Sequence, residues 1–82
     1  MEVLEKLEQL IRHVLNDDSI VLNDETTAHQ VEGWDSLAHI TFMYAIEYEF
    51  DIAFDADEFS NVADIGRLRQ LIESKLGMTT GG

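Results

Sequence analysis

Apolar residues recur at spacings of three and four near the start of the chain, and this pattern predicts an amphipathic helix from Glu2 to Leu15. The apolar face of this helix consists of Val3, Leu4, Leu7, Leu10, Ile11 and Val14. From there to Gly33, apolar residues occur in short patches, at Ile20-Val21-Leu22 and at Val31, so we expect a long loop pinned to the core. Loops of this length are uncommon in compact domains and are often functional, which directs attention to the residues that follow.

A second helix is predicted from Ser36 to Phe50. Asp35 or Ser36 can accept a hydrogen bond from the free backbone N–H groups of its first turn. One stripe of this helix is assigned to the core and consists of Phe42, Met43, Ile46 and Phe50. The neighbouring stripe consists of Leu37, Ile40 and Tyr44, beside Glu47 and Tyr48.

Two shorter helical segments complete the pattern. Asp55 and Glu58 have the spacing of a capping box, which predicts a short helix through Ser60. Asp64 is the expected cap of a last helix that ends at Gly77. Its inward residues are predicted to be Ile65, Leu68, Leu71, Ile72 and Leu76. The expected fold class is therefore all-α, a small four-helix bundle with a long first loop and a short third helix, in which adjacent helices pack nearly antiparallel.

The length of 82 residues limits the chemistry that the chain can support. We expect one domain over residues 1–77 and a disordered tail over residues 78–82. A domain of this size buries only about 60% of its unfolded surface, which leaves little room for a deep pocket. No apolar run approaches the ~20 residues that span a bilayer, and the first six residues lack the basic start of a signal peptide, so a cytoplasmic location is the default expectation.

The charge and the cysteine count restrict the function classes further. A net charge of −12 repels nucleic acid and anionic membrane surfaces and favours basic partners. The chain contains no cysteine, so it has no disulfide, no thiolate metal ligand and no cysteine nucleophile. A function that depends on a thiol would need that thiol from another source.

Asp35, Ser36 and His39 permit a serine hydrolase hypothesis, because a serine and a histidine three residues apart on a helix can touch. The remaining machinery is missing. Asp35 adjoins the serine and points away from the far nitrogen of the imidazole, and so short a chain cannot surround an oxyanion hole with a pocket that excludes water. We therefore expect no catalytic residue and a half-exposed His39 on the helix surface.

No metal site is expected either. The three histidines, His13, His29 and His39, show no pairing at ligand spacing. The segment 55–59 begins like a calcium loop but lacks the glycine at its sixth position and the glutamate at its end. We expect a solvated acidic face that attracts Mg²⁺ or Ca²⁺ only weakly.

Asp35-Ser36-Leu37 precedes a helix that ends in Glu49-Phe50-Asp51-Ile52, and in this combination the chain resembles the acyl carrier proteins over nearly its whole length. The resemblance implies that a phosphopantetheinyl transferase attaches phosphopantetheine from coenzyme A to Ser36, with Mg²⁺, and that the thiol of this arm carries an acyl group as a thioester. Two features of the sequence agree with it. A phosphodiester at a helix N-terminus lies near free N–H groups, and a chain without cysteine needs an imported thiol.

The resemblance also implies transient partners, namely the transferase and the enzymes that load and process the acyl group. Attraction between an acidic carrier and basic docking patches speeds their encounter. The expected docking surface lies on the second and third helices and consists of Asp35, Leu37, Ile40, Tyr44, Glu47, Asp57 and Val62. We expect a monomer that binds neither nucleic acid nor membranes.

Several residues differ from the pattern of fatty-acid-synthesis carriers. Ala38 and Thr41 stand where those carriers often have acidic residues, Asp55 stands where proline is common, and Trp34 is a less usual choice. These differences favour a specialised carrier, with an aminoacyl or small hydroxyacyl cargo among the options and the pathway, fatty acid or polyketide, left open. The Phe-rich core either leaves less space for a long acyl chain or reflects aromatic packing alone. The alternative is an unmodified acidic interaction module that mimics DNA, which requires no serine at position 36.

Overall fold

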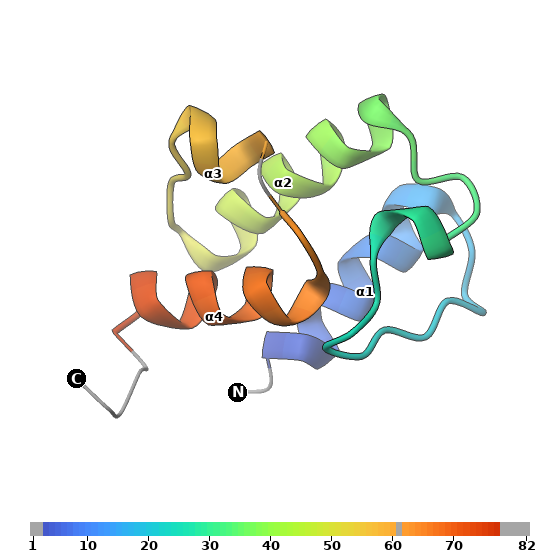
Figure 1. Cartoon of the computed structure of the whole chain (residues 1–82), viewed down its shortest axis with the longest axis horizontal. Coiled ribbons are helices and arrows are strands. Elements are labelled where there is room, and N and C mark those ends of the chain that lie inside the picture. Colours follow the sequence, from blue (N-terminus) through green and yellow to red (C-terminus); the bar gives the residue numbers. More distant parts are fainter. Residues whose placement is uncertain (1–2, 61, 78–82) are drawn as a thin grey trace.

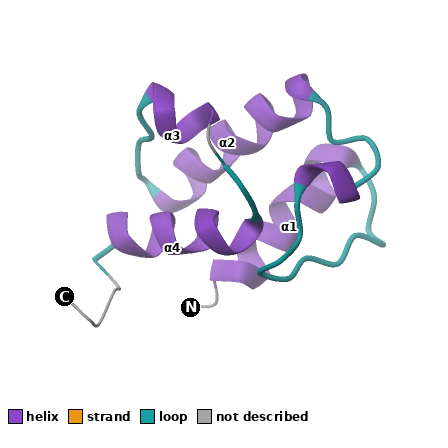
Figure 2. Ribbon diagram, viewed as in Figure 1, coloured by secondary structure: helices purple, strands orange, loops and turns teal. Residues whose placement is uncertain are grey.

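The computed structural model describes residues 3–60 and 62–77, and within these ranges it contains only helices and loops. The elements are α1 (Val3–Leu15), the 3₁₀-helix η1 (Ala28–Gln30), α2 (Ser36–Phe50), α3 (Ala56–Ser60) and α4 (Ile65–Lys75) (Figures 1 and 2). The predicted four-helix bundle with a long first loop and a short third helix is thus confirmed. The sequence pattern did not predict η1, and the expected start of the first helix at Glu2 and the expected tail over residues 78–82 lie outside the described residues.

The three longer helices each contribute one apolar stripe to a shared core, as their periodicity predicts. The buried residues are Val3, Leu7 and Ile11 of α1, Phe42, Met43, Ile46 and Phe50 of α2, and Ile65, Leu68 and Ile72 of α4. Full burial of such a side chain stabilises the fold by about 1.5–3 kcal/mol. Leu71 and Leu76, which were also expected to turn inward, are only partly buried.

α1 packs against both α2 and α4, and it runs in the opposite direction to α2 (Figure 1). The third helix is held beside α2, where the ring of its Phe59 meets the ring of Tyr44 with the centroids 5.1 Å apart. α2 therefore has one face on the core, while part of another face meets α3. The predicted near-antiparallel packing of neighbouring helices holds for α1 and α2.

The long first loop is fixed to α1 by polar contacts as well as by its apolar patches. Ile20 and Leu22 are buried, while Val21 between them is 70% exposed. The Glu8 carboxylate accepts a hydrogen bond from the Leu22 N–H at 2.9 Å, and Arg12 Nε donates to the Ile20 carbonyl at 2.7 Å. The loop is therefore pinned as expected, with backbone groups satisfied by charged side chains of the helix.

The same loop also closes over the start of α4. The Gly66 N–H donates to the Asp24 carbonyl at 2.8 Å, and the Arg69 guanidinium donates to both oxygens of the Asp24 carboxylate at 2.9 Å. A Cβ on Gly66 would lie 2.9 Å from the Asp24 carbonyl oxygen, so this close approach requires glycine. These contacts fix the position of the loop that precedes α2.

Side-chain caps define the shorter helices, as the sequence predicts. Asp55 accepts from the Glu58 N–H at 2.8 Å, and Glu58 accepts from the Asp55 N–H at 3.0 Å, which completes the capping box of α3. Asp64 accepts from the Arg67 N–H at 2.8 Å and caps α4. None of the helices in the described ranges combines the length and the apolar composition that a bilayer crossing requires.

Candidate functional site

The first turn of α2 presents Ser36 to solvent. Asp35 is the N-cap and accepts a hydrogen bond from the Ala38 N–H at 2.8 Å, so of the two expected caps the structure uses the aspartate. Ser36 is the first residue of the helix and is exposed, and the turn that follows the cap contains no acidic side chain. Its hydroxyl therefore lies at the positive end of the helix dipole without a capping duty.

The residue before the cap organises the site. Trp34 follows Gly33, whose φ of 89° lies in the left-handed region that favours glycine. The indole Nε1–H donates to His39 Nδ1 at 3.3 Å, and the two rings stack with their centroids 6.2 Å apart. The indole also packs in a T-shaped arrangement against the ring of the buried Phe42, with the ring centroids 5.2 Å apart. Trp34 thus connects the imidazole to the core.

These contacts fix the tautomer of His39. Because Nδ1 accepts from Trp34, the proton lies on Nε2, which donates to the Phe59 carbonyl of α3 at 2.9 Å. Both ring nitrogens therefore have partners other than Ser36, and the Asp35 carboxylate is occupied as the cap. The arrangement that a serine hydrolase needs is not formed here.

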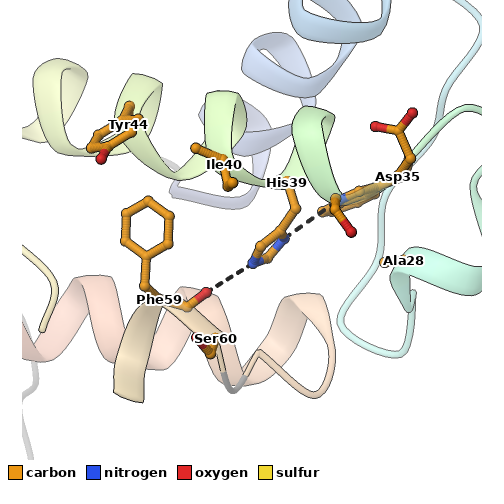
Figure 3. A pocket seen from close by; sticks show the side chains of 9 residues that line it. Ala28, Asp35, His39, Ile40, Tyr44, Phe59 and Ser60 are labelled. Atoms are coloured by element: carbon orange, nitrogen blue, oxygen red, sulfur yellow. Dashed lines mark hydrogen bonds between the residues drawn. The ribbon is translucent and has the colours of Figure 1, made fainter. Parts of the chain in front are cut away.

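A groove of about 680 Å³ extends from Ser36 between α2 and α3 (Figure 3). Its ring-bearing side chains are Trp34, His39, Tyr44 and Phe59. Ile40 adds an aliphatic contact, and Ser60 ends α3 beside it. We refer to this feature as the groove. It is an open surface feature next to the exposed serine, in agreement with the expectation that so small a domain has no deep pocket.

The seven residues of the expected docking surface differ in exposure. The exposed members are Asp35, Leu37, Ile40, Tyr44 and Asp57. Leu37, Ile40 and Tyr44 share one face of α2, and Ile40 and Tyr44 also line the groove. Glu47 is partly buried and accepts from the Phe54 N–H at 2.8 Å, while Val62 packs partly against the core. The last two side chains therefore have structural contacts within the domain.

Sequence reasoning missed some residues of this region. Tyr48 was placed beside the stripe of Leu37, Ile40 and Tyr44 but left out of the docking surface. It is 90% exposed and continues the stripe by one more turn, as its spacing of four from Tyr44 could have indicated. Phe59 packs partly against the core and also lines the groove, where its carbonyl bonds His39. The pairing of Phe59 with His39 spans twenty residues, and no local pattern predicts it.

The acidic segment 55–59 acts as a helix start. The carboxylates of Asp55 and Glu58 cap α3, and Glu58 also pairs with Lys75 at 2.9 Å. In residues 3–60 and 62–77, no group of three or more His, Asp or Glu side chains lies close enough to hold a metal ion.

Comparisons with known proteins give one informative result. No protein-family model and no curated protein matches the sequence. Among solved structures, the solution NMR structure of a holo acyl carrier protein from Geobacter metallireducens is similar to this chain, with a TM-score of 0.85 and 36% sequence identity. The match covers 94% of this chain and 88% of that chain.

Proposed function

The chain belongs to the acyl carrier protein family, and we propose that it carries its acyl group on a phosphopantetheine arm attached to the Ser36 hydroxyl. Members of this family act as carriers and are not catalytic enzymes. The observation that carries the proposal is the position of Ser36, which is exposed at the first residue of α2 and opens onto the groove. When bound, the arm supplies the thiol that a chain without cysteine lacks, and this thiol holds the acyl group as a thioester.

The residues at the start of α2 fit a phosphodiester. The unpaired N–H groups of the first turn and the helix dipole stabilise negative charge there, by about 0.3–1 kcal/mol at an exposed site. Asp35 is the nearest carboxylate in sequence, and its oxygen is directed at the Ala38 N–H at 2.8 Å. Its charge is thereby partly compensated by the helix that it caps.

The groove supports a second part of the proposal, that cargo on the arm folds back against the protein. Its ring-bearing walls offer apolar contact beside the attachment point. A thioester that lies in the groove is less accessible to water than one that extends freely from the surface. The groove therefore protects the cargo between encounters with partner enzymes.

We propose further that this is a specialised carrier with its own loading enzyme. The first turns of α2 carry Ala38, which is partly buried, and Thr41, whose hydroxyl donates to the Leu37 carbonyl at 3.0 Å. The exposed stripe there is apolar, so a partner that recognises it needs apolar contacts as well as the positive charge that suits the acidic chain. The mass of the group bound to the protein isolated from its own cells identifies the cargo.

The attachment is tested by incubating the purified chain with coenzyme A, Mg²⁺ and a broad-specificity phosphopantetheinyl transferase and then measuring its mass. We expect a gain of one phosphopantetheinyl group in the unaltered chain and none in Ser36→Ala. Ser60→Ala is the matched control, since Ser60 is an exposed serine that lines the same groove. It should be modified like the unaltered chain.

Two results would contradict the proposal. One is an unchanged mass under conditions that fully modify a known carrier. The other is a mass gain that persists in Ser36→Ala, because it would place the group on a different residue.

A further inference from the structure

His39 ties three segments of the chain together at the middle of the groove. Its Nδ1 accepts from Trp34 in the turn before α2, and its Nε2 donates to the carbonyl of Phe59 near the end of α3 (Figure 3). Phe59 is held a second time, since its ring packs edge-on against Tyr44 at 5.1 Å. The end of α3 is therefore fixed to α2 at two positions five residues apart.

The core on the other side of α2 is closed. The side chains of Phe42, Met43 and Ile46 are fully buried and belong to one core cluster. The Trp34 indole packs against Phe42, so the groove is separated from the core by filled space. A long chain that entered the domain from the groove would have to separate α3 from α2.

We propose that His39 determines the class of cargo that the groove shelters. By linking Trp34 to Phe59, His39 holds α2 and α3 together at the groove. A compact acyl group, of a few carbons or one ring, then lies against the ring-bearing walls of the groove. A long aliphatic chain cannot pass between the two helices and is left in solvent. The inference rests on the proposed function, because it assumes a cargo tethered at Ser36.

The physical reason lies in what each kind of cargo gains. A single ring or short chain can contact Trp34, Tyr44 or Phe59 within the open groove. Each further methylene of a long chain gains stability only where it leaves water, and an open groove covers only the part of the chain that touches its walls. Entry between the helices would break the bond from His39 to Phe59 and leave two partly buried polar groups without partners.

The test attaches cargo chemically, so that it does not depend on any transferase. The chain has no cysteine, and Ser36→Cys therefore gives one thiol at the attachment point. Iodoacetamide and its N-butyl, N-benzyl and N-dodecyl derivatives are attached to this thiol in three backgrounds, with His39 retained, with His39→Ala and with His39→Gln. The fluorescence of Trp34, the single tryptophan, reports contact in the groove, and the Tm reports burial of the cargo.

In the chain that retains His39, we expect the benzyl adduct to shift the Trp34 emission relative to the adduct of iodoacetamide itself. The dodecyl adduct and the butyl adduct of this chain should have the same Tm. In His39→Ala, the dodecyl group should raise the Tm above that of the butyl adduct by about 4 °C, a shift typical of a modest stabilisation in a domain of this size. In His39→Gln, the dodecyl and butyl adducts should have the same Tm, as in the chain that retains His39, because the glutamine amide can still donate to the Phe59 carbonyl.

The proposal is overturned if the dodecyl group raises the Tm of the histidine chain well above that of the butyl adduct, or if the benzyl group leaves the Trp34 emission unchanged. Both results are read in the chain that retains His39, so they remain decisive even if His39→Ala does not fold. If His39→Ala folds and its dodecyl and butyl adducts have the same Tm, the role of His39 is likewise overturned. Since alkylation replaces the transferase, neither result is confused with a failure of Ser36 to accept phosphopantetheine.

Discussion

Asp35 and Ser36 are adjacent, exposed and polar, yet they have different tasks. The aspartate carboxylate caps α2 through the Ala38 N–H, and the serine hydroxyl lies at the first helical position with no part in the cap. The separation has a practical consequence, because the residue that we propose is modified need not also hold the helix end. Stability and attachment can therefore be altered independently.

Substitution of the cap tests this separation. Asp35→Ala should lower the free energy of unfolding by about 1 kcal/mol, the usual cost of losing an N-cap acceptor. Ser36→Ala should leave it nearly unchanged, since the serine makes no cap contact. Urea unfolding followed by circular dichroism measures both. Equal destabilisation by the two substitutions would show that the serine shares the cap.

At the scale of elements, α3 depends on its neighbours. Its five residues are too few for a stable isolated helix. Besides its own capping box and the contacts of Phe59, it is held by an ion pair in which Lys75 of α4 lies 2.9 Å from the Glu58 carboxylate. This hydrogen bond from Lys75 keeps the pKa of Glu58 below its ordinary value, with help from the Asp55 backbone N–H.

The ion pair should make stability depend on pH in a defined direction. A depressed carboxyl pKa stabilises the fold above the ordinary pKa, and this contribution is lost as the pH falls through the lower folded-state value. Glu58→Gln should therefore have a lower Tm than Glu5→Gln at pH 7. The difference should shrink as the pH falls below the ordinary carboxyl pKa of about 4.3 and vanish below the lower folded-state value. Both variants remove one negative charge, and Glu5 is exposed on α1, so net charge is matched. A difference that stays constant down to pH 2 would mean that the charge of Glu58 is unimportant.

α2 presents its apolar stripe outward along most of its length. Leu37 is 72% exposed, Tyr44 60% and Tyr48 90%, although apolar side chains of this size usually avoid water. An exposed stripe beside the proposed attachment point is typical of a surface that partners contact. Contact with partners explains why α2 is apolar on part of its outer face as well as on its core face.

We expect the stripe to contribute to recognition by the transferase. Leu37→Ser should reduce kcat/KM for modification of the apo protein by roughly tenfold, which corresponds to about 1.4 kcal/mol. Val21→Ser is the matched control, because Val21 is equally exposed but lies in the first loop. Mass spectrometry of timed samples gives both rates, and equal rates for the two variants would remove Leu37 from the recognition surface.

At the scale of the whole molecule, negative charge is in large excess. Four of the five basic side chains, Lys6, Arg12, Arg69 and Lys75, are engaged in ion pairs with carboxylates. Arg69 is the most strongly engaged, and hydrogen bonds to Asp24 and Glu73 raise its pKa above the ordinary value. The remaining carboxylates repel one another across a small surface, which opposes the compact state and favours basic partners.

Salt should therefore stabilise this protein. Between about 0.01 M and about 1 M NaCl the Debye length falls from about 30 Å to about 3 Å, so the repulsion is screened and the Tm should rise. Millimolar Mg²⁺ should have the same effect at lower concentration. A variant with both Glu5→Gln and Asp57→Asn, two exposed sites, should show a smaller rise. A Tm that does not respond to either salt would exclude charge repulsion as an important term.

Local signals in the sequence were sufficient for much of the fold. The stripe of Phe42, Met43, Ile46 and Phe50 was recognisable from its spacing, because helical periodicity depends only on neighbouring turns. The caps at Asp55 and Asp64 were recognisable for the same reason, since a capping side chain bonds a backbone group three residues away. The turn η1 was missed, although Thr27 and Gln30 have the spacing of a capping box and the Gln30 side chain accepts from the Thr27 N–H at 3.0 Å.

What the sequence by itself determined is the four α-helices, the main core stripes of α1, α2 and α4 and the position of Ser36 at the start of α2. Only the tertiary structure decided that Glu47 bonds the Phe54 N–H within the domain and that His39 meets Phe59 to shape the groove beside Ser36. The physical reason is the distance along the chain over which each contact acts. Periodicity and caps are properties of adjacent residues, whereas a groove forms where separate elements meet, and their meeting depends on how the whole core packs.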